Sequence, residues 1–184
     1  MNDGHARPAI VLDASVALAR LRLQDASPLV FASLEGWVRD ELRFLVPSVF
    51  WLEVLNALAK KHRYDGEDLV EAVYELQRIG IATIPFDEPQ MWMTIHIQDL
   101  HGLTSYDASY LALAETTDAR LATLDRELAN AAGPRAVYLG RDPWPGQRIS
   151  DVRAPYGREA AWPRWRFAAS YLADLRRRVA VGQG

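Results

Sequence analysis

Four carboxylates lie where the neighbouring residues are mostly apolar: Asp13, Glu53, Asp107 and Asp125. An ionised carboxylate is costly to bury without a partner, so acids in such a context need a physical reason. A divalent cation held between them supplies one, because Mg²⁺ and Mn²⁺ prefer oxygen ligands. Cations held in this way can activate water and stabilise the leaving oxygen of a phosphodiester. The acids therefore predict a metal-dependent hydrolase.

Three of these acids also have an ordinary structural interpretation. Asp13 and Asp125 each follow an apolar run and precede a helical pattern, and Asp is a good N-cap at such a position. Asp107 comes three residues after Thr104, which is the spacing of a capping box. Glu53 is harder to explain in this way, because its neighbours at helical spacing form a largely apolar face. Helix capping and metal binding are compatible, so both interpretations stay open.

Short apolar runs alternate with helical patterns along most of the chain. This alternation predicts a parallel sheet with helices on both faces. The expected strands cover residues 9–12, 44–46, 81–84, 119–124 and 136–139. The expected helices cover residues 15–23, 34–42, 48–62, 67–79, 88–100, 104–117 and 126–132, with Ser48 as an N-cap. The functional crevice of such a sheet lies at the carboxyl ends of its strands, where Asp13 and Asp125 are expected.

Charge divides the chain near residue 140. Residues 1–140 carry 12 Lys and Arg against 20 Asp and Glu, a net charge of −8, whereas residues 141–184 carry nine Arg and four acids, a net charge of +5. A cluster of Pro and Gly at residues 142–146 separates the two parts, and helical spacing returns from Trp165. We expect one globular domain over residues 1–140 and a basic extension that ends in a helix.

Composition also excludes several classes of function. The 184 residues include no cysteine, which excludes disulfides, thiolate catalysis and cysteine-bound zinc and is typical of a reducing cytoplasm. No apolar run approaches the ~20 residues of a membrane-spanning helix. The first residues lack the pattern of a secretory signal. We therefore expect a cytoplasmic protein that makes no membrane contact.

The segments around the four acids resemble the motifs of the PIN-domain ribonucleases, and most closely those of the VapC-type toxins of bacterial toxin–antitoxin pairs. The matching segments follow the order of the family motifs and are residues 10–15, 46–58, 102–108 and 121–128. The resemblance covers roughly residues 8–140. It implies a PIN-like three-layer α/β sandwich, in which helices cover both faces of a central five-stranded parallel sheet.

The resemblance also implies a function and its residues. The activity would be endoribonuclease cleavage by metal-activated water, with Mg²⁺ or Mn²⁺ as cofactor and RNA as substrate. The acidic quartet would be Asp13, Glu53, Asp107 and Asp125, with all but Glu53 as metal ligands. Ser15 and Thr123 occupy the small hydroxyl positions of the family and would orient a carboxylate or a metal-bound water. A cognate antitoxin would inhibit the protein, which would also form a homodimer.

Residues 141–184 depart from the family pattern and leave three hypotheses open. They could form a basic arm that binds RNA, with Arg148, Arg164 and Arg166 among its contacts, because Arg pairs with phosphate. They could instead pack a terminal helix on the acidic domain and inhibit it as an antitoxin would. A structural cap or an oligomer contact, with its arginines in solvent, is the third hypothesis.

A second class of function competes with the nuclease. A PIN-like module could bind RNA or a protein partner without cutting, although the presence of all four acids favours an enzyme. A metal site contacts phosphate rather than base, so the sequence does not choose among RNA targets or exclude structured DNA. A haloacid-dehalogenase-type phosphatase needs a second Asp two positions after Asp13, where this chain has Ser15.

Overall fold

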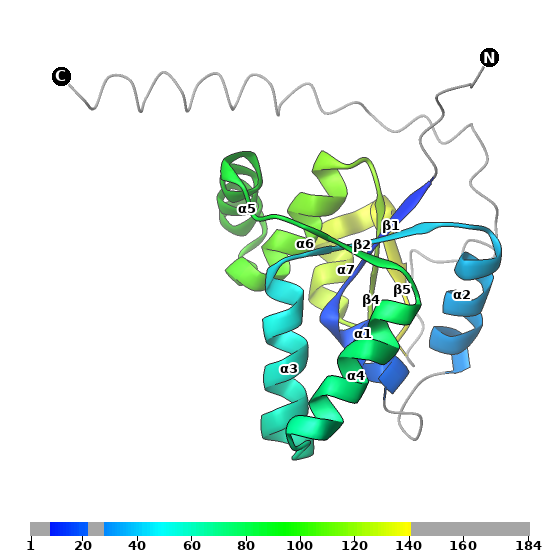
Figure 1. Cartoon of the computed structure of the whole chain (residues 1–184). Coiled ribbons are helices and arrows are strands. Elements are labelled where there is room, and N and C mark those ends of the chain that lie inside the picture. Colours follow the sequence, from blue (N-terminus) through cyan, green and yellow to red (C-terminus); the bar gives the residue numbers. More distant parts are fainter. Residues whose placement is uncertain (1–7, 22–27, 141–184) are drawn as a thin grey trace.

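In the part of the chain that the structure describes, five short strands form one parallel sheet in the order β3-β2-β1-β4-β5 (Figure 1). The computed structural model describes residues 8–21 and 28–140. The strands are β1 (Ala9–Leu12), β2 (Arg43–Pro47), β3 (Ile81–Ile84), β4 (Arg120–Thr123) and β5 (Ala136–Tyr138). The predicted sheet is confirmed. The predictions for the basic extension and its arginines concern residues outside the described part of the chain.

Seven α-helices are described within those residues, together with one short 3-10 helix. They are α1 (Ala14–Leu21), α2 (Pro28–Arg39), α3 (Val49–His62), α4 (Gly66–Arg78), α5 (Glu88–His101), α6 (Ser105–Thr116), α7 (Arg126–Ala132) and η1 (Gly133–Arg135). Helices α1, α2, α3 and α4 form one packed group, while α5 packs along α6 (Figure 1). The predicted α/β class is confirmed. Each helix in this part of the chain is too short or too polar to cross a membrane.

Helix α6 occupies the interior of the fold. It packs against β1, β2 and β4, and every residue from Ala108 to Ala114 is buried. A helix that is buried on all sides has small and apolar residues around its whole circumference, as in this Ala- and Leu-rich segment. Gly102 ends the preceding helix in a left-handed conformation (φ +67°), which Gly adopts without strain. This turn leads the chain directly into α6.

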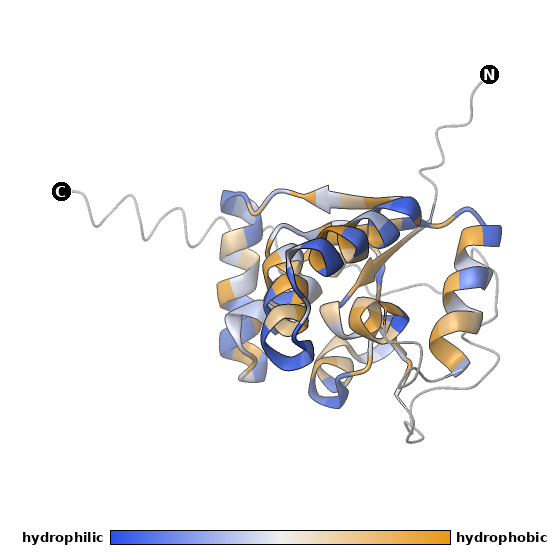
Figure 2. Cartoon of the chain, turned by 60° about the horizontal axis from the view of Figure 1, so that its bottom comes forward, coloured by the Kyte–Doolittle hydropathy of each residue, from blue (hydrophilic) through white to orange (hydrophobic). Residues whose placement is uncertain are grey.

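The core lies between the sheet and its helices. Figure 2 shows hydrophobic residues along the strands, whereas hydrophobic and hydrophilic residues alternate along the surface helices. The large side chains that are fully buried in this core include Phe44, Phe50, Leu58, Tyr110 and Leu121. Tyr110 is the exception in this set, because it brings a hydroxyl group into the core.

Two predictions about element ends were wrong. Helix α2 begins at Pro28 rather than at residue 34, because Pro is tolerated in the first turn of a helix and Val30 already belongs to the buried face. Ser48 precedes α3, but its side chain does not cap that helix. Its backbone is helical rather than extended, and its Oγ accepts from the backbone N–H of Phe86 at 3.2 Å.

Candidate active site

Asp13 lies directly after β1, at the carboxyl edge of the sheet, and only 6% of it is exposed. Its backbone N–H donates to the carbonyl of Ala122 at 3.0 Å, which fixes it against β4. The hydroxyls of Ser15 and Thr123 both donate to its Oδ2, the latter at 2.7 Å. One oxygen of this buried carboxylate is therefore held by two side chains from different elements.

The two hydroxyl groups are themselves fixed by the backbone. Ser15 Oγ accepts from the N–H of Leu124 at 3.0 Å, and Thr123 Oγ1 accepts from the N–H of Asp125 at 2.9 Å. A hydroxyl that accepts from an N–H group keeps its single proton for another partner. In both residues that proton points to Asp13. These contacts also link Asp13 to the segment that carries Asp125.

Glu53 lies on α3, is half-buried and accepts a hydrogen bond at Oε2 from the phenol of Tyr110. Tyr110 is on α6 and is fully buried. Sequence reasoning missed Tyr110 as part of the site. A signal was available, because Tyr110 comes three residues after Asp107 and residues at that spacing share one helix face.

Asp107 lies in the first turn of α6 and is half-buried. Thr104 Oγ1 accepts from the backbone N–H of Asp107 at 3.2 Å and donates to its Oδ2 at 2.7 Å. The Asp107 carboxylate thus bonds to the hydroxyl of the N-cap residue instead of closing a capping box on its backbone. This contact positions the carboxylate at the end of the helix.

Asp125 is exposed and is the N-cap of α7. Its Oδ1 accepts from the backbone N–H groups of Glu127 at 2.7 Å and Leu128 at 3.0 Å. The interpretation of Asp125 as a helix N-cap is therefore confirmed. Asp125 is linked to the other acids through Thr123, which bonds to both its backbone and Asp13.

Asp13, Glu53 and Asp107 form one electrostatic group. Burial raises the pKa of Asp13, and the charge of Asp107 adds to this effect, while the bonds from Ser15 and Thr123 oppose it. Burial also raises the pKa of Glu53, and the charges of Asp13 and Asp107 raise it further against the bond from Tyr110. Burial and the bond to Glu53 raise the pKa of the Tyr110 phenol, so it stays protonated as a donor.

The donor chemistry of this group fits a hard divalent cation. Within residues 8–21 and 28–140, no three acidic or imidazole side chains lie close enough together to form a ready-made metal cluster. The acids nevertheless offer only oxygen donors, and a cation between them would offset both the burial and the mutual repulsion that raise the pKa values of Asp13 and Glu53. Binding would require the carboxylates to draw together.

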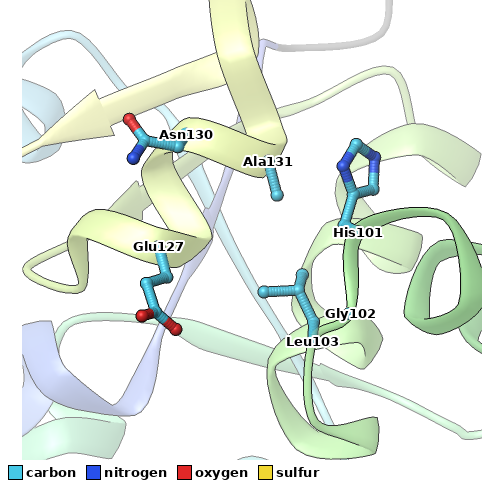
Figure 3. A pocket seen from close by; sticks show the side chains of 6 residues that line it. All are labelled: His101, Gly102, Leu103, Glu127, Asn130 and Ala131. Atoms are coloured by element: carbon cyan, nitrogen blue, oxygen red, sulfur yellow. The ribbon is translucent and has the colours of Figure 1, made fainter.

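A cavity of about 460 Å³ lies between the end of α5 and α7 (Figure 3). It is lined by His101, Gly102, Leu103, Glu127, Asn130 and Ala131. These residues adjoin, in the sequence, the segments that begin α6 and α7 and carry Asp107 and Asp125. The lining therefore combines polar and apolar residues that are close in the sequence to two of the predicted site residues.

Both the sequence and the fold of this chain are similar to those of known proteins. A family model described as PIN domain matches residues 10–134. Exonuclease VapC9 from Pyrobaculum aerophilum is 31% identical over 108 residues, which are 58% of this chain and 81% of that protein. The crystal structure of PAE2754 from Pyrobaculum aerophilum matches with a TM-score of 0.52 at 26% identity, over 72% of this chain and 90% of that chain. A toxin–antitoxin complex from Klebsiella pneumoniae matches with a TM-score of 0.54 at 18% identity, over 70% of this chain and 95% of that chain, a likeness of fold alone.

Proposed function

Since the chain belongs to the PIN domain family, we propose that it is a metal-dependent endoribonuclease and the toxin of a toxin–antitoxin pair. One observation carries the proposal: Asp13 is a buried carboxylate that two hydroxyls orient beside two further acids. Such a group costs stability unless a cation occupies it. A cation site made of oxygen donors at the edge of a parallel sheet suits phosphodiester hydrolysis.

Each residue has a role in this proposal. Asp13, Asp107 and Asp125 would hold Mg²⁺ or Mn²⁺, which when bound supplies an activated water and stabilises the leaving oxygen. Ser15 and Thr123 hold Oδ2 of Asp13, so the orientation of that carboxylate is fixed before substrate binds. Glu53 is the candidate general base, because its raised pKa brings it closer to the operating pH than an ordinary Glu.

The proposed biological setting follows from the relatives. The relative from Pyrobaculum aerophilum is named VapC9, and one solved neighbour is a toxin–antitoxin complex. We propose that a cognate antitoxin binds and inhibits this protein, that the active form is a homodimer, and that this form cleaves RNA in the cytoplasm. The cavity between α5 and α7 is a candidate position for a nucleotide next to the cleaved bond.

The mode of cleavage needs its own test, because VapC9 is named an exonuclease. A circular RNA and a linear RNA of the same sequence separate the two modes, since only an endonuclease cuts the circle. We expect the circle to be cut with Mg²⁺ or Mn²⁺ but not with EDTA. Asp107→Asn should abolish cutting. Asp99→Asn, which changes an exposed Asp on the neighbouring helix α5, should not. Degradation of the linear RNA alone would establish an exonuclease.

One observation favours the second function, a PIN-like module that binds RNA or a protein without cutting. The acids among the described residues do not form a ready-made metal cluster. Calorimetric titration with Mn²⁺ distinguishes the two functions. The nuclease requires binding that Asp107→Asn weakens, whereas a module without catalytic activity would show no Mn²⁺ binding and no cutting while it still bound RNA.

A further inference from the structure

We propose that Tyr110 is a positioning residue, whose phenol fixes Glu53 relative to Asp13 and Asp107. The inference rests on the proposed function and deepens it. It concerns a residue that is neither an acid nor one of the small hydroxyl residues predicted from the sequence. Its hydroxyl group is the feature that matters, because Phe would fill the same volume in the core.

Tyr110 is fully buried, and its neighbours on α6 from Ala108 to Ala114 are buried as well. A phenol in such surroundings needs a hydrogen-bond partner, because a buried polar group without one is costly. Its partner is the carboxylate of Glu53, which comes from α3 and is 57 residues away in the sequence.

The phenol lies where three segments of the site meet. Its oxygen bonds to Glu53, and it is near enough to the backbone of Ala14, the residue directly after Asp13, for that backbone to lower the pKa of the phenol. Asp107 lies one turn earlier on the same helix. The phenol on α6 therefore bonds to α3 and lies near the β1–α1 junction, and these are the elements that carry Asp107, Glu53 and Asp13.

The hydrogen bond runs from the phenol to the carboxylate. An ionised carboxylate has no proton to donate, so Tyr110 is the donor and Glu53 the acceptor. A donor of this kind favours the ionised form of Glu53 and restricts its side chain to one arrangement. Without the donor, this long, half-buried side chain would regain rotamer freedom. The donor thus keeps the carboxylate at the site.

Tyr110→Phe tests the inference, because it removes one oxygen atom and keeps the ring. We expect about a tenfold loss of kcat, the range found when a residue that orients a metal site is removed, with KM little changed. Mn²⁺ affinity measured by calorimetry should also fall, because the charge of Glu53 acts on the same group as Asp13 and Asp107 although Glu53 is not one of the proposed ligands. Tyr74→Phe is the matched control, because Tyr74 is 63% exposed on α4, and it should behave like the wild type.

A second pair of variants shows whether Tyr110 acts through Glu53. Tyr110→Phe should cause no further loss of kcat or Mn²⁺ affinity in a Glu53→Gln background, since the carboxylate that it positions is gone. An equal loss in both backgrounds would overturn the inference. So would a Tyr110→Phe protein that melts earlier but keeps wild-type kcat and Mn²⁺ affinity, because its role would then be structural only.

Measurements on the wild-type protein separate the proposed nuclease function from the inference about Tyr110. If it neither binds Mn²⁺ nor cuts RNA, the proposed function is wrong and the inference falls with it. If the wild type binds and cuts while Tyr110→Phe matches it in kcat, KM and Mn²⁺ affinity, only the inference is wrong.

Discussion

Asp13 is a carboxylate whose cost of burial is only partly offset by its own hydrogen bonds. Ser15 and Thr123 donate to it, yet the net effect of burial and of the charge on Asp107 is a raised pKa. Glu53 is in the same position, with Tyr110 as its donor. Both buried acids therefore lower the stability of the fold, and the proposed metal ion would offset this cost.

The raised pKa values predict how stability depends on pH. The folded protein holds protons on Asp13 and Glu53 at pH values where the unfolded chain has lost them. The contribution of these groups to the free energy of unfolding is therefore fully present below their ordinary pKa values, and is lost as pH rises through the raised ones. Urea titrations of EDTA-treated protein should show this decrease toward neutral pH, and Glu53→Gln should reduce it. A curve with the same pH dependence in both proteins would contradict the assignment.

Replacement of Asp13 should separate stability from activity. Asp13→Asn keeps an oxygen that can accept from Ser15 and Thr123 while it removes a buried charge. We expect the metal-free variant to melt a few degrees above the wild type at neutral pH and to lose RNA cleavage. Calorimetry and the circular-RNA assay measure the two effects. A variant that unfolds would show instead that the charge of Asp13 is needed for folding.

Metal binding should reverse this order of stability. A ligand that binds only the folded state raises the melting temperature, so millimolar Mn²⁺ should stabilise the wild type. The shift should be small in Asp13→Asn, which lacks one of the proposed metal ligands. An equal shift in both proteins would place the ion elsewhere.

At the scale of elements, Arg135 joins the end of α6 to the segment before β5. Its Nε bonds to Glu115 at 2.9 Å, and its Nη1 bonds to Asp118 at 3.0 Å and to the carbonyl of Ala119 at 3.2 Å. Only 10% of the Arg135 side chain is exposed. These contacts hold the turn into β4, the strand that ends beside Asp13.

Arg135→Ala should therefore destabilise the fold. Removing charge-assisted hydrogen bonds from a buried side chain costs about 2 kcal/mol of unfolding free energy. Arg39→Ala on α2 is the matched control, because Arg39 is exposed. Urea denaturation compares the two variants, and equal stability would show that the Arg135 contacts contribute nothing net.

At the scale of the whole molecule, the main feature is the division of charge between the acidic residues 1–140 and the basic residues 141–184. The described domain carries the acids, while the nine arginines of residues 141–184 lie outside the described residues. RNA is repelled by an acidic surface, so a basic extension on the same chain would help to bind it. Of the three hypotheses for the extension, we therefore propose the RNA-binding arm.

A chain that ends at Gly140 tests this preference. We expect it to remain folded by circular dichroism and to bind RNA more weakly, with a shallower dependence of affinity on salt because fewer phosphates are neutralised. Titrations at several salt concentrations measure both quantities. Higher cleavage activity would instead support internal inhibition, and a loss of folding would support the structural cap.

The sequence by itself determined the class of fold and the candidate acids. Strand and helix patterns depend on neighbours within a few residues, so apolar runs and their spacing were sufficient to predict the sheet and the position of Asp13 at its edge. Local patterns were weaker at element ends. Pro28 began a helix earlier than expected, and Ser48 bonds to Phe86 instead of capping α3.

Only the tertiary structure decided which acids interact and what holds them. The contact between Glu53 and Tyr110 spans 57 residues, and that between Asp13 and Thr123 spans 110. No local sequence pattern predicts contacts between residues so far apart in the chain, because these contacts follow from how the strands and α6 pack. The structure also showed that Asp125 caps α7 while Asp13, Glu53 and Asp107 share one electrostatic environment. Burial creates that environment, and burial is a property of the folded chain rather than of its sequence.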